Sequence, residues 1–177
     1  IMELKPEECL RLKEEGLYTC CIKNPLPEKK EVTHGRSDTE FIRGKVPMTK
    51  EEVREVSICK LKLCEGAIVY DIGSGTGSIA VEIAGLSDDI KVFAVEHKEE
   101  AAILIESNRE KFGLENIEIV LAKAPEGLWG LPTPTHAFIG GSGGRMKEIL
   151  SALYQMNPCM RVVINAISME TICEIRE

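Results

Sequence analysis

Ala67-Ile-Val-Tyr-Asp-Ile-Gly-Ser-Gly-Thr-Gly77 joins a short apolar run directly to a glycine cluster. Such a run is typical of a buried strand that ends in a tight turn. The residues from about Thr76 to Leu86 then have the apolar spacing of a helix. In a strand, turn and helix unit of this kind, the N–H groups of the turn and the helix N-terminus face whatever lies above the sheet, so the loop is a candidate ligand site.

The spacing of the glycines and a later acidic residue indicate the kind of ligand. Gly73, Gly75 and Gly77 follow the pattern G-x-G-x-G, whereas the dinucleotide fingerprint is G-x-G-x-x-G, and this difference favours a ligand without a pyrophosphate. Glu96 lies 23 residues after Gly73, at the end of the next expected strand, where a carboxylate can accept both hydroxyls of a ribose. These features predict an adenosyl ligand, and S-adenosylmethionine fits better than NAD. Asp71 either holds the loop or reaches the methionine amino group, and both roles stay open.

The rest of the chain alternates between strand and helix patterns. Further strands are expected at 91–96, 117–121, 135–139 and 160–166, with helices at 50–63, 99–112, 146–156 and from 168 to 177. Thr49-Lys-Glu-Glu52 has the form of a capping box that starts the first of these helices. Single helices between strands imply right-handed crossovers, so the predicted fold class is α/β with a doubly wound parallel sheet.

Composition excludes several classes of protein. With 177 residues, 44% of them hydrophobic and 29% charged, the chain has the composition of one globular domain. Its net charge of -7 argues against a general binder of the phosphate backbone, so no nucleic-acid partner is expected. No apolar run reaches the length of a membrane span and no signal pattern opens the chain, so we expect a cytoplasmic protein without a membrane partner. The seven cysteines form no C-x-x-C pair, which predicts reduced thiols that pack as small hydrophobes and no metal site.

Residues 1–37 do not share the alternating pattern. They contain Pro6, Pro25 and Pro27, one candidate strand at Leu17 to Ile22, and the start of a polar stretch from Glu28 to Asp38. We therefore expect a linker, with the tail of an upstream domain before it, and place the main domain at residues 38–177.

Five separated motifs together resemble one family, the decarboxylating precorrin methyltransferases of cobalamin synthesis, and specifically the cobalt-precorrin-6B carbon-15 methyltransferases. The motifs are Glu40-Phe-Ile-Arg-Gly-Lys-Val-Pro-Met-Thr-Lys-Glu-Glu-Val-Arg54, Asp71-Ile-Gly-Ser-Gly-Thr-Gly-Ser78, Ala124-Pro-Glu126, Phe138-Ile-Gly-Gly-Ser-Gly-Gly144 and Asn165-Ala-Ile-Ser-Met-Glu-Thr171. Their order is that of the family, and they cover about residues 38 to 177. Gly16-Leu-Tyr-Thr-Cys-Cys-Ile22 more weakly resembles the end of the carbon-5 methyltransferase that some members carry upstream.

The resemblance implies a class I methyltransferase fold, S-adenosylmethionine as methyl donor, methylation at carbon 15 of the macrocycle and loss of carbon dioxide from the ring C acetate. Matched motif by motif, the donor site is formed by Thr49, Asp71, Gly73, Ser74, Gly75, Thr76, Gly77, Glu96 and Ala124. Lys123 stands where the family usually carries an acidic residue, which implies different contacts to the adenine. No dedicated base is predicted, because methyl transfer to a nucleophilic carbon mainly needs donor and acceptor held in line.

The expected substrate is an anionic tetrapyrrole. Gly140, Gly141, Ser142, Gly143 and Gly144 would form the floor of its cleft, since glycines let a flat macrocycle lie against the backbone. Arg43, Lys45, Lys50 and Arg145 are expected to form a positive rim for its carboxylates, and Asn165 and Glu170 to orient it. The family suggests a homotetramer. Its fold normally adds two strands after the last helix seen here, so the C-terminal strands of the sheet are expected to be missing.

The alternative functions predict different sequence motifs and different ligands. A nucleic-acid base methyltransferase would carry an Asn/Asp-Pro-Pro-aromatic motif after the fourth strand to hold a flipped base, where this chain has Ile139-Gly-Gly-Ser-Gly-Gly144. A nucleotide-binding module without turnover would bind the donor and transfer nothing. A methyltransferase of another small molecule is a further alternative, and an NAD-linked oxidoreductase would bind NADH.

Overall fold

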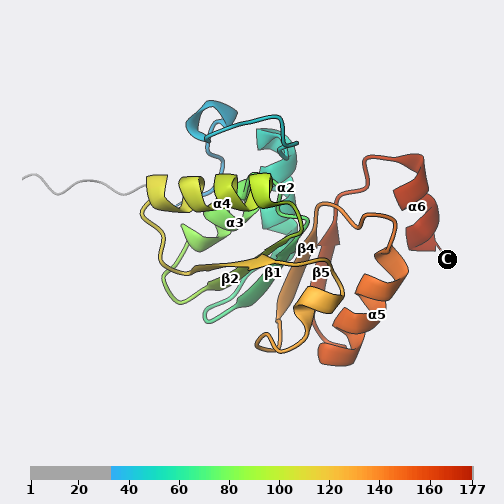
Figure 1. Ribbon diagram of the computed structural model, residues 1–177. Coiled ribbons are helices and arrows are strands. Elements are labelled where there is room, and N and C mark those ends of the chain that lie inside the picture. The colour runs from blue at the N-terminus through green and yellow to red at the C-terminus, as the bar shows by residue number, and fades with distance from the viewer. Residues whose placement is uncertain (1–32, 177) are drawn as a thin grey trace, which may run out of the picture. The chain divides into compact units, whose positions relative to one another are not determined.

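A parallel five-stranded sheet forms the centre of the computed structural model, which describes residues 33–176 (Figure 1). The strands are β1 (Ile68–Ile72), β2 (Lys91–Glu96), β3 (Ile117–Leu121), β4 (His136–Ile139) and β5 (Arg161–Ile164). Their order is β3-β2-β1-β4-β5, and every neighbouring pair is parallel. The order reverses direction between β1 and β4, and ligands of open α/β sheets bind at such switch points, outside the carboxyl ends of the strands.

Helices cover both faces of the sheet. On one face lie α2 (Glu51–Leu61), α3 (Ser78–Ala84) and α4 (Glu99–Lys111), and α5 (Met146–Met156) lies on the other, with α6 (Met169–Arg176) beside it (Figure 1). Two short 3-10 helices complete the described part, η1 (Asp38–Glu40) and η2 (Glu126–Leu128). The doubly wound parallel sheet predicted from the sequence is thus confirmed, and the expected helix and strand bounds agree within a few residues.

The core is divided by the sheet into two apolar clusters. Along β1, Val69 belongs to the cluster under α3 and α4, while Tyr70 and Ile72 belong to the cluster against α5. Successive strand residues point to opposite faces, and both faces are buried, so β1 shows no polar alternation and is apolar except at the buried Asp71.

The expected capping box at Thr49 is wrong. Helix α2 begins at Glu51, its N-cap residue is Lys50, and no side chain caps it. The Thr49 carbonyl oxygen instead accepts a hydrogen bond of 2.6 Å from the guanidinium of Arg54. Thr49 is therefore held outside the helix by a side chain one turn further on.

The role of buried small hydrophobes is wrong for Cys59, Cys64, Cys159 and Cys173, which are free and exposed. They lie on solvent-facing sides of helices or in turns, where no core packing is available to them.

The candidate strand at Leu17 to Ile22 and most of the expected linker lie outside the described residues. Residues 33–37, which the sequence assigns to that linker, pack on the domain.

Candidate functional site

A cavity of about 550 Å³ lies at the carboxyl ends of β1, β2 and β4, where the strand order reverses. Its volume is in the range of small-molecule sites. The walls include the chain before α2, the glycine loop after β1, the loops after β2 and β3, the glycine-rich segment after β4, and the chain after β5. Segments that are far apart in sequence thus meet where the topology predicts a ligand.

The glycine loop is shaped by close backbone packing. Gly73 has φ +70°, and a Cβ at this position would lie 2.6 Å from the carbonyl oxygen of Gly141. The N–H groups of Gly73 and Ser74 both donate to the Val95 carbonyl oxygen, at 2.9 and 3.3 Å. Glycine is required at position 73 because the loops after β1 and β4 touch there, and this contact closes one side of the cavity.

Glu96 places a buried carboxylate in the wall of the cavity. Its Oε2 accepts a hydrogen bond of 3.1 Å from the N–H of Gly75, and its Oε1 accepts from the N–H groups of His97 and Lys98 at 2.7 and 3.0 Å. The residue is 6% exposed. A carboxylate oxygen has room for more than one donor, so this side chain can both fix the loop and accept hydroxyls of a ribose.

Asp71 lies beneath the glycine loop and is absent from the cavity wall. It is fully buried, and its Oδ2 accepts a hydrogen bond of 2.6 Å from the Ser74 hydroxyl. Its Oδ1 has no partner among the described residues. Burial raises the pKa of Asp71 to about 7, a rise to which the charge of Glu96 adds and against which the Ser74 hydrogen bond acts. Of the two roles left open by the sequence, the geometry favours holding the loop.

Asp71→Asn should cost less stability at pH 8 than at pH 5. The native pKa of Asp71 lies above its ordinary value of 3.8, so the native state keeps a proton that the unfolded state releases. The stability linked to that proton is complete below about pH 4 and is lost as the pH rises through 7. Asparagine cannot titrate. Urea unfolding of both proteins at the two pH values should show the gap shrink by up to about 3 kcal/mol, and a gap independent of pH would contradict the shifted titration.

The segment after β4 leads into helix α5 and is tied to the loop after β3. Arg145 donates from its two Nη atoms to both carboxylate oxygens of Glu126, each at 2.7 Å. It also donates to the Ala124 carbonyl oxygen at 3.3 Å. These contacts lower the pKa of Glu126 to about 2 and hold two walls of the cavity together.

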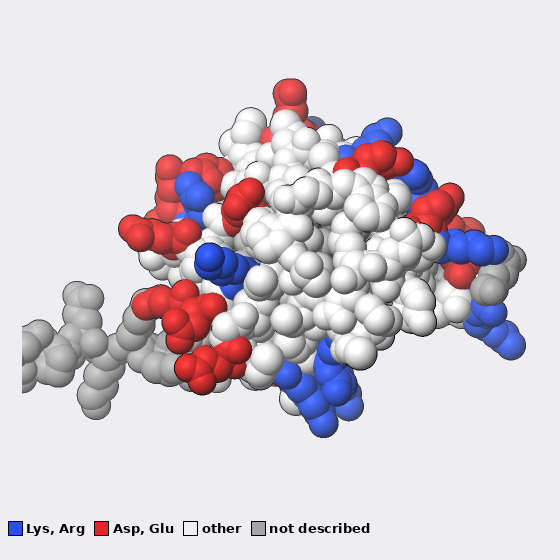
Figure 2. All heavy atoms as spheres, turned by 90° about the horizontal axis from the view of Figure 1, so that it is seen from below, with Lys and Arg blue, Asp and Glu red and all other residues white. Residues whose placement is uncertain are grey.

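The expected positive rim is only partly open to a ligand. Lys50 pairs with Asp38 at 3.1 Å, and Arg145 pairs with Glu126. The face seen from below in Figure 2 is largely uncharged at its centre, and its charged side chains lie toward the margin. That face offers no continuous basic surface of the kind that follows a phosphate backbone.

The structure brings most of the predicted site residues to one cavity. Of the expected donor residues, Thr49, Gly73, Ser74, Gly75, Glu96 and Ala124 line it; of the expected substrate residues, Lys50, Gly140, Gly141, Ser142, Gly143, Arg145 and Asn165 do. The wall does not include Asp71, Thr76, Gly77, Arg43, Lys45, Gly144 or Glu170. Thr76 and Gly77 are buried; Thr76 lies in the turn before α3, and Gly77 is the N-cap residue of that helix.

Several wall residues were missed by the sequence reasoning. They are Val46, Pro47, Met48, Val53, Ile72, Val95, His97, Lys98, Ala122, Ile149 and Ile167. Lys123, which the sequence singles out for its change of charge, also lines the cavity. Those after β2 and β3 could have been found, since they follow a strand end at the predicted edge. Val46 to Met48 carried no such signal, because they precede the first strand and reach the site only through tertiary contacts.

A membrane-spanning helix and a group of metal ligands are both absent from the described part of the chain. Among residues 33–176, no helix combines the length and apolar composition needed to cross a bilayer. In the same part of the chain, no three Cys, His, Asp or Glu side chains are grouped as metal ligands.

Comparison with known proteins adds independent findings. The family model described as "precorrin methyltransferase domain" matches residues 40–176. A probable cobalt-precorrin-6B C(15)-methyltransferase (decarboxylating) of Sulfurisphaera tokodaii is 44% identical over 142 residues, which are 78% of this chain and 73% of that protein. A crystal structure from Geobacter metallireducens, titled precorrin-6y C5,15-methyltransferase, has a TM-score of 0.76 at 37% identity and covers 80% of this chain and 74% of that one. A SAM-dependent O-methyltransferase of Thermotoga maritima has a TM-score of 0.62 at 22% identity, covers 72% of this chain and 48% of that one, and shows the fold alone.

Proposed function

Because the chain belongs to the precorrin methyltransferase family, we propose that it methylates carbon 15 of a cobalt-precorrin with S-adenosylmethionine and removes carbon dioxide from the ring C acetate. The observation that carries the proposal is the cavity at the switch point, with Glu96 in its wall. The relatives' names supply the substrate class. The cavity supplies a place for the donor in this chain.

The residues present fit the donor. Glu96 would accept the ribose hydroxyls, and the backbone of Gly73 to Gly75 allows close approach of the methionine part. Ala122 and Ala124 would present small side chains to the adenine, and Thr49 lines the cavity from the segment before α2. Bound there, S-adenosylmethionine supplies an electrophilic methyl group, and the enzyme's part is to hold it in line with the acceptor carbon and to keep water out.

The segment after β4 fits a carboxylated macrocycle. The N–H groups of Gly141, Ser142 and Gly143 donate no backbone hydrogen bond to any described residue, so they are free to face a carboxylate. Decarboxylation breaks the bond between the acetate methylene and its carboxylate, the electron pair passes to the conjugated ring system, and a proton from solvent completes the methyl group. A carboxylate held with few stabilising partners loses carbon dioxide more readily.

Arg145→Gln should raise the KM for the tetrapyrrole about tenfold, because a charge-assisted hydrogen bond to a substrate carboxylate would be lost. The affinity for S-adenosylhomocysteine should fall by less than the KM rises, since Arg145 reaches the donor side only through its hydrogen bond to the Ala124 carbonyl oxygen. Lys147→Gln, which removes an exposed cation outside the cavity wall, is the control. Equal KM values in the two variants would remove Arg145 from the substrate site.

The proposal is tested in two steps. Calorimetric titration with S-adenosylhomocysteine, with NADH as control, should show binding of the first ligand only. A single turnover with methyl-labelled S-adenosylmethionine and the cobalt-precorrin substrate should then release one carbon dioxide per methyl transferred. Donor binding with no methyl transfer would support a binding module without turnover, transfer without carbon dioxide release would point to another small-molecule acceptor, and binding of NADH alone would overturn the methyltransferase assignment.

A further inference from the structure

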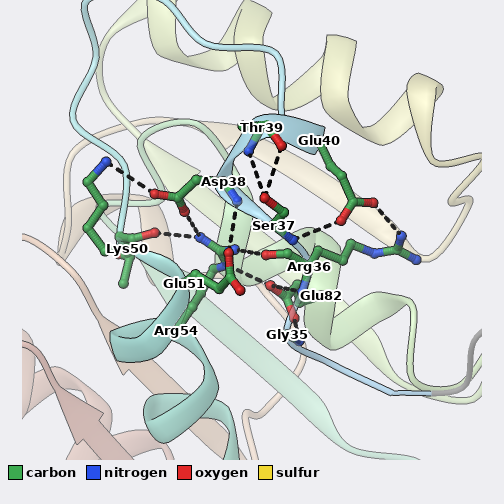
Figure 3. A network of polar contacts seen from close by, with 11 residues as sticks. Gly35, Arg36, Ser37, Asp38, Thr39, Glu40, Lys50, Glu51, Arg54 and Glu82 are labelled. Atoms are coloured by element: carbon green, nitrogen blue, oxygen red, sulfur yellow. Dashed lines mark hydrogen bonds and ion pairs between the residues drawn. The ribbon is translucent and has the colours of Figure 1, made fainter.

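A buried guanidinium lies behind the donor side of the cavity. The side chain of Arg54, on α2, is 0% exposed. Its Nε donates to Glu82 Oε1 at 2.6 Å, its Nη1 donates to Asp38 Oδ1 at 2.9 Å and to the Thr49 carbonyl oxygen at 2.6 Å, and its Nη2 donates to the Arg36 carbonyl oxygen (Figure 3). All of these partners except Glu82 belong to residues 33–50, which we call the strap.

Glu82 completes the attachment from α3. Its side chain is 0% exposed, and beside Arg54 it accepts hydrogen bonds from the backbone N–H groups of Gly35 and Arg36. Both ends of the strap thus converge on one buried ion pair. Gly35 and Arg36 contact it at one end (Figure 3). Thr49 contacts it at the other end. The two charges are compensated by each other and by strap groups.

The middle of the strap is tied to the glycine loop by a second buried side chain. Asn108, on α4, accepts from the N–H of Ile42 at 2.7 Å and donates to the Ile42 carbonyl oxygen at 3.1 Å. The same amide nitrogen donates to the Thr76 carbonyl oxygen at 2.9 Å. One side chain therefore fixes the strap and the glycine loop relative to each other.

The end of the strap forms a wall of the cavity. Val46 to Lys50 all line it, and the Pro47 carbonyl oxygen lies 2.9 Å from the position of a Cβ on Gly75. The strap and the glycine loop are thus in contact across the donor side. A shift of the strap by a fraction of an ångström changes the shape of that side.

We propose that Arg54 and Glu82 are positioning residues for the donor site, which act through the strap by holding Thr49 and its neighbours against the glycine loop. This inference rests on the proposed function, because it names the ligand whose affinity the strap controls. Neither side chain lines the cavity, so neither is expected to touch the donor.

The pair is poorly explained by stability alone. Removing two charges from water is costly, and replacing a buried ion pair with apolar residues of similar volume is often neutral or stabilising. An apolar pair would pack between α2 and α3 and would offer nothing to the strap groups now bound. Stability and strap position can therefore be separated by experiment.

Three variants of the full 177-residue chain make that separation. Glu82→Gln removes one charge of the pair, and the double variant Arg54→Met with Glu82→Met replaces both charges by apolar side chains. Glu106→Gln is the matched control, since it removes the carboxylate of another Arg–Glu pair, on α4, that is partly exposed and makes no strap contact. The readouts are the dissociation constant of S-adenosylhomocysteine, the urea midpoint, and amide exchange at Gly35 and Arg36.

If the pair positions the strap, Glu82→Gln and the double variant should bind S-adenosylhomocysteine at least tenfold more weakly than the wild type. The amides of Gly35 and Arg36 should exchange faster in both variants. Both effects should appear even if the urea midpoint of the double variant equals that of the wild type. Glu106→Gln should stay within twofold. Wild-type affinity in a folded double variant would overturn the proposal. If both Glu82 variants fail to fold, Asp38→Asn decides, because Asp38 is a partly exposed partner of Arg54 within the strap. Weaker binding in that variant supports the proposal and unchanged binding overturns it.

Failure of the proposed function has a different signature. If the wild-type chain itself does not bind S-adenosylhomocysteine, the donor assignment is wrong. The exchange rates of Gly35 and Arg36 still report whether the pair holds the strap, because they require no ligand.

Discussion

Glu96→Ala should weaken the binding of S-adenosylhomocysteine more than a hundredfold. The substitution leaves the ribose hydroxyls without an acceptor, and each unpaired buried group costs about 1 to 3 kcal/mol. It also removes the acceptor of three backbone N–H groups, those of Gly75, His97 and Lys98. The carboxylate is thus both a ligand contact and the anchor of the loop, and the two losses act in the same direction. Calorimetry gives the dissociation constant directly.

Two further variants help to separate the possible causes of that loss of affinity. Glu96→Gln keeps the size and one carbonyl oxygen, so its loss should lie between those of the wild type and Glu96→Ala. Glu118→Ala removes an exposed glutamate from the neighbouring strand β3 and should leave affinity unchanged. An alanine variant at position 96 with wild-type affinity would reduce Glu96 to a structural cap of the loop.

Local patterns were enough to predict the fold. Strands β2 and β3 and helix α5 have the predicted bounds, because each is a clear periodic or apolar segment closed by polar or turn residues. Glu96 and the glycine loop were predicted for the same reason, since both follow strand ends, and parallel topology brings strand ends together.

The strap could not be predicted in this way. Arg54 has the spacing of an ordinary charge on a helix surface, yet it is fully buried. Its partner Glu82 lies 28 residues away, and Asn108 lies 66 residues from Ile42. Contacts of such separation leave no trace in local periodicity, so Val46 to Met48 were missed, although Thr49 and Lys50 of the same wall were predicted.

The positions of charged residues in the sequence predicted the positive rim of the cavity only in part. Lys50 and Arg145 do reach the cavity, but each already has a carboxylate partner, Asp38 and Glu126 respectively. A count of charges cannot show pairing, because the acidic partners come from separate loops. A substrate carboxylate must therefore compete with Glu126 for Arg145, and this competition limits what that residue adds to affinity.

Gly75→Ala should weaken the binding of S-adenosylhomocysteine about a hundredfold. Gly75 has φ +60°, and a Cβ there would lie 2.9 Å from the Pro47 carbonyl oxygen. Backbone cannot move aside as a flexible side chain can, so the strap and the glycine loop must separate. That movement also weakens the hydrogen bond from the Gly75 N–H to Glu96. Calorimetry with urea unfolding distinguishes lost affinity from lost folding.

Gly66→Ala is the matched control. Gly66 has φ +67°, and a Cβ there would meet nothing within 4 Å. Both variants carry a similar backbone strain of about 1 kcal/mol, but only the one at position 75 forces two walls of the cavity apart. If the two alanine variants bind the ligand equally well, contact between the strap and the loop does not shape the site. Because the Gly75 N–H donates to Glu96, the losses from Gly75→Ala and Glu96→Ala should fall short of additive when combined, since each variant already breaks the contact that the other would remove.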